Sequence, residues 1–129
     1  MKLGYTIIYV PDVPATIAFY EAAFGVTQKF IHDSQLYGEL STGETTLAFA
    51  GNEAAEMGGI AIQPNAPSAL PAGWEVCFVT NGVAGAFKRA VDAGCVPLTP
   101  PTDKPWGQTV SYVRDLNGCL VEIASPVGG

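Results

Sequence analysis

The first half of the chain alternates between short strand-like stretches and one segment with helical spacing. Tyr5 to Val10 is rich in β-branched and aromatic residues, which favours a strand, and Asp12 can cap a following helix. The helix is indicated by an apolar stripe at helical spacing, formed by Val13, Ile17, Tyr20 and Phe24. Three further strand-like stretches follow at 26–31, 35–40 and 45–50. This half therefore predicts a strand, a helix and three strands.

The second half repeats that order. Glu75 to Thr80 predicts a strand, and the helical stripe that follows consists of Val83, Phe87, Ala90 and Val91. Strands are then predicted at 95–98, 109–113 and 119–123, with a Pro-rich loop before the second of them. Tyr5 aligns with Glu75 and Val13 with Val83, at the same offset. A repeated unit that cannot bury its sheet alone is expected to pack against its copy.

The segment between the halves, 51–73, is rich in Gly, Ala and Pro and has no sustained periodicity. It predicts a connector, with a short ordered piece at Ile60 to Ile62. Loops of this length in small domains are usually functional or mobile. The prediction is one α+β domain over residues 1–129, with a first βαβββ module at about 1–50, the connector at 51–73 and a second module at about 74–126.

Composition narrows the classes of partner. The chain has 129 residues, 48% of them hydrophobic and 14% charged, with a net charge of −6 and no cluster of Lys or Arg. Nucleic acid and anionic membranes need a concentrated cationic surface, so neither is expected as a partner. The N-terminus shows no secretory signal and no stretch is long enough to span a bilayer, which predicts a cytoplasmic protein. Few charges and many apolar residues also favour self-association.

Cysteine and histidine limit the candidate chemistry. Cys77, Cys95 and Cys119 form no CxxC pair and lie in or beside apolar stretches, so they are expected to be small core residues in a reducing compartment. His32 is the single histidine and falls at a predicted turn. No phosphate-binding glycine loop and no GxSxG motif is present, which argues against nucleotide hydrolysis and serine-hydrolase chemistry.

Two carboxylates stand among apolar strand residues, Glu75 and Glu122. They form a remnant metal site, a metal-free acid/base pair, or buried carboxylates paired with Arg114, Lys104 or a tyrosine hydroxyl. If both face one cavity they repel each other, and one pKa should rise, as a general acid requires. Unpaired buried charge is too costly to keep without a role, which favours a function for the pair.

Aromatic residues supply candidate ligand contacts. Trp106, between Pro105 and Gly107, is either a wall for a bound ring or acyl chain or an anchor for its loop. Tyr112 is either a ligand contact or a half-buried packing residue.

The motifs that carry a family resemblance lie in both halves. Val10-Pro11-Asp12-Val13 and Ala18-Phe19-Tyr20 mark the first; Pro105-Trp106-Gly107, Arg114-Asp115, Asn117-Gly118 and Val121-Glu122-Ile123 mark the second. Together with the tandem βαβββ pattern they resemble the vicinal oxygen chelate superfamily, which includes glyoxalases, bleomycin-resistance proteins, fosfomycin-resistance enzymes and extradiol dioxygenases. The resemblance implies two cupped mixed sheets around a central cavity, and a homodimer.

Metal-dependent members of that superfamily bind a divalent ion through four strand positions, which correspond here to Tyr5, Ala48, Glu75 and Glu122. Alanine has no donor atom, and a tyrosine phenol stays protonated at neutral pH. A two-His-one-carboxylate iron site needs two histidines, and the chain has one. No metal cofactor is therefore expected; if a divalent metal ion does bind, Glu75 and Glu122 are its ligands.

Three functions remain open. The first is a bleomycin-resistance-type protein that binds a small organic molecule in the cavity without a complete metal site, a cationic ligand being favoured by the acidic chain. Its ligand contacts are Tyr5, Ala48, Trp106, Tyr112 and Arg114. The second is a glyoxalase-like lyase, isomerase or epimerase, in which Glu75 and Glu122 are catalytic and hold a metal that polarises a carbonyl. The third is an interaction protein whose cavity is closed by side chains.

Overall fold

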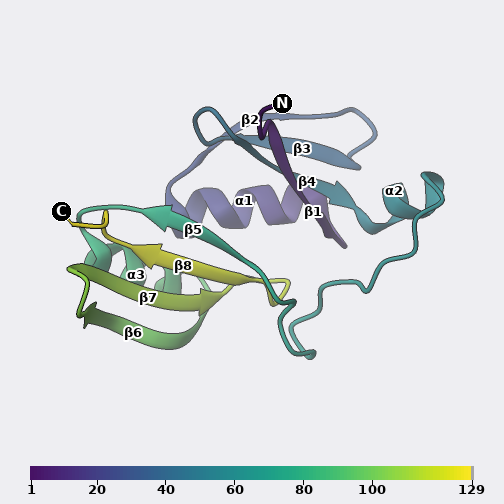
Figure 1. Cartoon of the computed structure of the whole chain (residues 1–129). Helices are drawn as coiled ribbons and strands as arrows, with labels where there is room; N and C mark the ends of the chain where they lie inside the picture. The colour runs from purple at the N-terminus through teal and green to yellow at the C-terminus, as the bar shows by residue number, and fades with distance from the viewer. Residues whose placement is uncertain (129) are drawn as a thin grey trace. The chain divides into compact units, whose positions relative to one another are not determined.

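Eight strands form two four-stranded mixed sheets in the computed structural model, which describes residues 1–128 (Figure 1). The chain divides into two units, one spanning Met1–Asn65 and the other beginning at Ala66, and each contains one sheet. The predicted α+β fold of two repeated modules is confirmed. Within residues 1–128, no helix combines the length and the hydropathy needed to cross a membrane.

The first unit contains four strands and two helices. They are β1 (Tyr5–Val10), α1 (Val13–Phe24), β2 (Thr27–Ile31), β3 (Tyr37–Ser41), β4 (Thr46–Gly51) and α2 (Asn52–Met57). The strand order is β1-β4-β3-β2, with β1 parallel to β4 and the other neighbours antiparallel. Side chains alternate between the two faces of the sheet. One face packs on α1, and the other, called the open face, is not covered by this helix.

Helix α1 begins and ends where its sequence predicts. The Asp12 carboxylate accepts a hydrogen bond from the backbone N–H of Ala15 at 3.0 Å, and Gly25 ends the helix with a φ of 70°. A side chain would be strained in that left-handed conformation, which glycine adopts freely. The buried stripe of α1 includes Tyr20, whose ring centroid lies 4.9 Å from that of Phe49 on β4.

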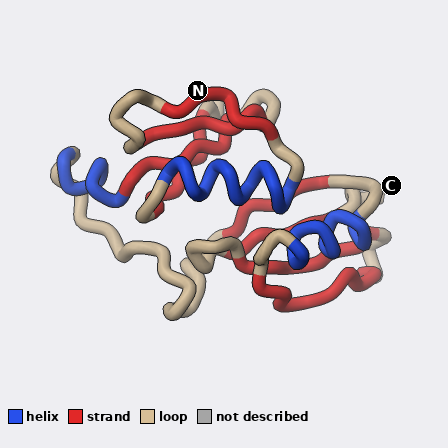
Figure 2. Tube along the Cα trace, turned by 180° about the vertical axis from the view of Figure 1, so that it is seen from behind, coloured by secondary structure: helices blue, strands red, loops and turns tan. Residues whose placement is uncertain are grey.

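The second unit has the same topology. Its elements are β5 (Glu75–Val79), α3 (Val83–Asp92), β6 (Val96–Lys104), β7 (Gln108–Arg114) and β8 (Leu120–Ala124). The order β5-β8-β7-β6, with β5 parallel to β8, matches the order in the first unit strand for strand. Seen from behind, α3 lies against one face of its sheet (Figure 2). Each unit therefore contains one βαβββ module, which is followed in the first unit by α2.

The segment 51–73 contains a helix that the sequence did not predict. Asn52–Met57 forms α2, whereas Ile60 to Ile62, predicted as an ordered piece, belong to no regular element. Six residues give too few turns for an apolar period to be recognised, and so short a helix depends on its packing for stability.

Strand β6 is longer than predicted. The Pro-rich segment, expected to be a loop from residue 99 on, continues the strand to Lys104. The pairing with β7 shifts register between Pro97 and Thr99 and again between Thr99 and Thr102. Proline is tolerated here because β6 is an edge strand, where an N–H is not required on the outer side.

Candidate functional site

The face of the second sheet opposite α3 carries a cluster of ionisable side chains. In the strand register Cys77 on β5 pairs with Glu122 on β8, and Glu122 pairs on its other side with Tyr112 on β7. Glu75 lies two residues before Cys77 and therefore points to the same face. These four residues are called the carboxylate cluster below. The structure thus brings together three of the residues that the sequence singled out, Glu75, Glu122 and Tyr112.

Every other member of the carboxylate cluster has its pKa raised beside Glu122. The pKa of Glu75, an exposed residue, is raised by partial desolvation first, and then by the charge of Glu122 and a hydrogen bond with it. The pKa of the Cys77 thiol rises to about 11, through partial desolvation and then through the charges of Glu122 and Glu75. Burial and the charge of Glu122 also raise the pKa of Tyr112. The hydrogen bond between the two carboxyl groups requires a proton on one of them, because an ionised carboxylate is an acceptor only.

Cys77 corrects one sequence expectation. Cys95 and Cys119 are buried as predicted, but Cys77 is exposed on the open face of β5. Its raised pKa keeps the thiol protonated near neutral pH, and a protonated thiol is a poor nucleophile. Cys77 is therefore a neutral neighbour of the carboxylates.

The guanidinium of Arg114 contacts backbone carbonyls. Its Nε donates to the carbonyl oxygen of Gly118 at 2.9 Å. Its two terminal nitrogens donate to three carbonyl oxygens in the segment 66–69: Pro67 at 3.2 Å, Ala66 at 3.3 Å and Ala69 at 2.7 Å. Four of the five N–H donors of an arginine are engaged in this way. A role of Arg114 in ligand binding stays a prediction; what the structure shows is a clamp on residues 66–69.

Gly118 makes room for this clamp. Its φ is 85°, and a Cβ there would lie 2.5 Å from Nη2 of Arg114 and 2.6 Å from the carbonyl oxygen of Ala66. Any side chain would therefore displace either the guanidinium or the segment that it holds.

We expect Arg114→Met to release the segment 66–69. Three hydrogen bonds to this segment would be lost, so local opening becomes easier and amide hydrogen exchange at Ala69 is expected to accelerate by roughly tenfold or more. Exchange measured by NMR or mass spectrometry checks this. Arg89→Met makes the same charge change at an exposed position of α3 and should leave the segment unaffected. Equal exchange in both variants would contradict the clamp.

Trp106 lies at the tip of the β6–β7 hairpin and is 58% exposed. Its Nε1 donates to Oε1 of Gln108 at 2.7 Å, and Nε2 of Gln108 donates to the carbonyl oxygen of Ser125 at 2.9 Å. These bonds support the loop-anchor interpretation. Tyr112 is four residues beyond Gln108 along β7, about 13 Å at strand spacing. The structure therefore places Trp106 apart from the carboxylate cluster.

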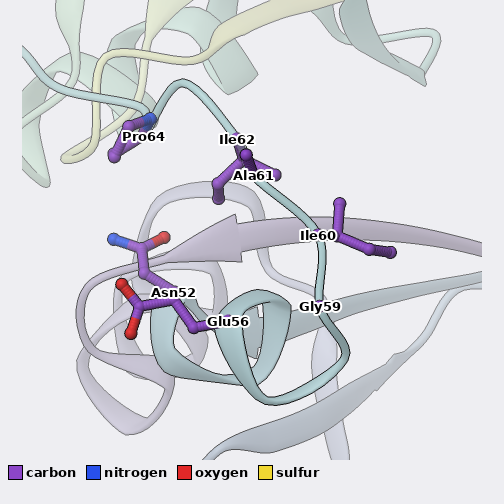
Figure 3. Close-up of a pocket in the computed structure, with 7 residues that line it drawn as sticks. All are labelled: Asn52, Glu56, Gly59, Ile60, Ala61, Ile62 and Pro64. Atoms are coloured by element: carbon purple, nitrogen blue, oxygen red, sulfur yellow. The ribbon is translucent and has the colours of Figure 1, made fainter.

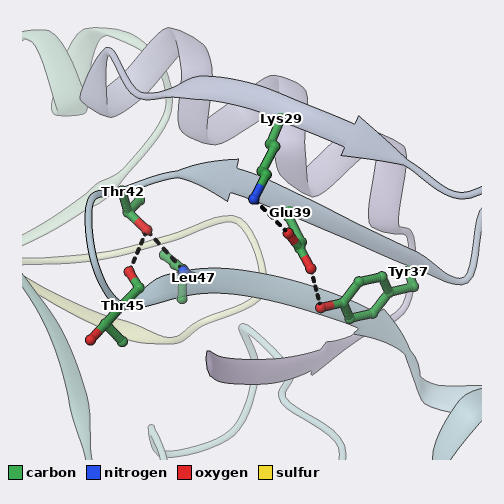
Figure 4. A network of polar contacts seen from close by, with 6 residues as sticks. All are labelled: Lys29, Tyr37, Glu39, Thr42, Thr45 and Leu47. Carbon is green, nitrogen blue, oxygen red and sulfur yellow. Dashed lines mark hydrogen bonds and ion pairs between the residues drawn. The ribbon is translucent and has the colours of Figure 1, made fainter. Parts of the chain in front are cut away.

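The open face of the first sheet carries a polar group that the sequence did not predict. Glu39 on β3 is only 7% exposed, and its carboxylate accepts a hydrogen bond from the Tyr37 hydroxyl at 2.7 Å. Nζ of Lys29 lies 3.6 Å from its other oxygen (Figure 4). The pKa of Tyr37 rises to about 12, through burial and then through the bond to Glu39. A signal existed: Glu39 alternates with apolar neighbours in a predicted strand, as Glu122 does.

The matching topology shows where the two open faces differ. Ala48 on β4 pairs with Ile7 on β1 and with Glu39 on β3. Glu122 occupies the corresponding position of the second unit, between Cys77 and Tyr112. The open face of the first sheet thus holds one carboxylate, that of Glu39 on β3, close to Lys29. The second holds two carboxylates on β5 and β8, and no cation contributes to the raised pKa of Glu75.

The donor atoms at the four expected metal positions do not fit a complete site. Glu75 and Glu122 supply carboxylate oxygens and are neighbours, but Ala48 has no donor atom and Tyr5 has a phenol. Among residues 1–128, no group of three or more His, Cys, Asp or Glu side chains is placed to hold a metal ion. Protein metal sites of the structural and catalytic zinc kinds use three or four protein ligands.

Comparisons with known proteins agree with this fold. The model of the Glyoxalase/Bleomycin resistance protein/Dioxygenase superfamily matches residues 2–123. A search of curated proteins found no match.

Solved structures with the same fold share little sequence with the chain. A glyoxalase-related enzyme from Fulvimarina pelagi has 23% identity and a TM-score of 0.82, over 98% of this chain and 88% of that one. A glyoxalase/bleomycin resistance protein/dioxygenase family enzyme from Burkholderia phytofirmans PsJN has 20% identity and a TM-score of 0.81, over 97% and 98%. TioX from Micromonospora sp. ML1 has 21% identity and a TM-score of 0.72, over 97% and 98%. At these identities the likeness shows the fold alone.

Proposed function

This chain belongs to the glyoxalase/bleomycin resistance protein/dioxygenase superfamily, and from that premise we propose that it binds a small organic cation at the carboxylate cluster. The observation that carries the proposal is the hydrogen bond between the side chains of Glu75 and Glu122 on the open face of the second sheet. The charge of Glu122 and a hydrogen bond with it raise the proton affinity of Glu75, and a positive charge that arrives beside the two carboxyl groups lowers their free energy in the same way.

The surroundings of the pair suit a mixed ligand. Val79, 61% exposed, and the half-buried Leu120 share the open face with the carboxylates and offer apolar contact. Tyr112 adds an aromatic ring and a hydroxyl that stays protonated. A ligand with a cationic group and an apolar body would therefore find both kinds of contact on this face. The net charge of −6 further favours the approach of cations.

The proposal includes a homodimer in a reducing compartment, the cytoplasm. The three cysteines are free thiols, as that compartment requires. Exposed Tyr5 and Ile7 on the edge strand β1 offer apolar surface to a partner. Light scattering after size-exclusion chromatography measures the mass directly, and a monomer at micromolar concentration would remove the dimer from the proposal.

Organic cations should raise the melting temperature of the chain. A panel of aromatic and aliphatic quaternary ammonium ions is compared with neutral molecules of the same shape by thermal shift and then calorimetry. A cation at 100 times its Kd is expected to stabilise the protein by about 2.7 kcal/mol. The Glu75→Gln, Glu122→Gln double variant should lose this stabilisation, whereas Glu44→Gln, Glu53→Gln makes the same charge change at exposed positions of the first unit and should keep it. Equal binding by both double variants, or binding by none of the panel, would overturn the proposal.

The raised pKa of Glu75 favours a second candidate, an enzyme of the glyoxalase type. Glu75, whose pKa is raised, would donate a proton to a substrate and Glu122 would accept one, so the two carboxyl groups could catalyse a lyase or isomerase reaction. Calorimetric titration of metal-stripped protein with manganese, nickel, zinc and magnesium tests its metal-dependent form. Stoichiometric micromolar binding that disappears in the Glu75→Gln, Glu122→Gln variant would favour this candidate, and assays on 2-oxoaldehyde hemithioacetals would follow.

A further inference from the structure

A cavity in the first unit lies outside the carboxylate cluster. None of the predicted catalytic, ligand-binding or metal-binding residues lines it. Its volume is about 450 Å³. It is lined by Asn52, Glu56, Gly59, Ile60, Ala61, Ile62 and Pro64 (Figure 3). Sites for small molecules usually have volumes of about 300–1,000 Å³. The size therefore suits a small organic ligand.

The cavity is built by α2 and by the segment 59–64, which returns past the helix. The N–H of Gly59 donates to the carbonyl oxygen of Glu56 at 2.9 Å, and the N–H of Ile60 donates to that of Ala55 at 2.9 Å. Gly59 has a φ of 75°, which suits glycine and reverses the chain. Just past the far end of the segment, Nδ2 of Asn65 donates to the carbonyl oxygen of Tyr9 on β1 at 3.0 Å. The wall of the cavity is thus fixed at both ends.

Asn52 presents a hydrogen-bond acceptor that nothing in the described chain satisfies. Its Oδ1 is buried and has no hydrogen-bond partner among residues 1–128. A buried acceptor without a partner destabilises a fold, and almost all such groups in native proteins are paired. One turn later on the same side of α2, Glu56 extends its carboxylate beside the Asn52 amide (Figure 3). Both side chains border the same cavity.

We propose that this cavity binds a primary alkylammonium group. An ammonium N–H would donate to Oδ1 of Asn52, and the carboxylate of Glu56 would balance the positive charge. The side chains of Ile62 and Pro64 would contact the attached hydrocarbon. An anion would find an acceptor and a negative charge here, which repel it. The proposed site is independent of Glu75 and Glu122, so either site can be present without the other.

Residue-resolved NMR titration with n-butylammonium chloride tests the proposal. Saturable shifts of the backbone amides of residues 52–63 are expected, with an affinity at least fivefold weaker in Asn52→Ala and in Glu56→Gln. Glu53→Gln is the matched control, because Glu53 carries the same charge on the same helix but does not line this cavity. The Glu75→Gln, Glu122→Gln variant should keep these shifts, which separates the site from the carboxylate cluster.

Two further probes separate hydrogen bonding from charge and from apolar contact. Tetramethylammonium has the charge without N–H donors, and 1-butanol has the hydrocarbon without the charge; neither should produce saturable shifts in this segment. The melting temperature of Asn52→Ala should be no lower than that of the unmodified chain, since the lost amide oxygen has no intramolecular partner. Binding of tetramethylammonium as tight as that of butylammonium, or no saturable shift with butylammonium, would overturn the proposal.

Discussion

Replacing Glu122 with Gln is expected to lower the pKa of the Cys77 thiol from about 11 towards its ordinary value of 9. Two of the four causes of the rise, a charge and a hydrogen bond, come from Glu122. Partial desolvation of the thiol, the largest cause, remains in the variant, so the fall in pKa should be partial, on the order of one unit. Removing Glu75 as well should lower the pKa further, because its charge is the third cause.

The pH dependence of alkylation measures this pKa. Cys95 and Cys119 are buried, so iodoacetamide reports on exposed Cys77. At pH 8.5, a fall of about one unit in the pKa of Cys77 raises the fraction of its thiolate form by about tenfold. The less basic thiolate is also less nucleophilic, so the rate should rise by only about three- to fourfold. The midpoint of the pH profile is therefore the better readout.

Glu53→Gln is the matched control for this measurement. It removes one carboxylate charge from α2, in the other unit, and should leave the midpoint of Cys77 alkylation unchanged. An unchanged midpoint in Glu122→Gln would mean that Glu122 does not approach Cys77 in solution. The carboxylate cluster, and the binding function proposed for it, would then lose its basis.

The fold was predictable because the signals for each helix and strand lie within a few residues along the sequence. Asp12 and Gly25 mark the two ends of α1 through hydrogen bonds within a few residues. The apolar stripe between them determines which face of the helix packs on the sheet. The repeat then supplied independent support, since the same order of elements appears twice. Where the local signal was weak the prediction failed, as with the single short helix α2 and the proline-containing edge strand β6.

The site was predictable only where it depends on the alternation of side chains between the two faces of a strand. Glu75 and Glu122 interrupt apolar strands, and the structure places them on one face. Glu39 was missed because the expected metal positions direct attention to Ala48, its partner on the next strand. The clamp formed by Arg114 was not predictable, because it joins residues at least 45 positions apart through backbone carbonyls, which carry no sequence signal.

Phe49→Ala is expected to have the largest effect on stability, a loss of about 3–5 kcal/mol in the free energy of unfolding. Phe49 is fully buried between β4 and α1, and its ring packs against that of Tyr20 at 4.9 Å. Truncation removes this contact and leaves a cavity that the surrounding strands cannot close. Denaturant titration followed by fluorescence or circular dichroism measures the change.

Phe30→Ala provides the comparison within the same unit. Phe30 lies on the edge strand β2 and is 39% exposed, so its truncation should lower the free energy of unfolding by less than half as much as that of Phe49.

The two faces of the first sheet should respond independently. Since Phe49 faces α1 while its neighbour Ala48 faces the open side of the sheet, Phe49→Ala should leave the pKa of Tyr37 near 12 under native conditions. Equal losses for the two variants would contradict the assignment of the α1 side as the core of this unit. A lowered Tyr37 pKa would show that the two faces of the sheet are not independent.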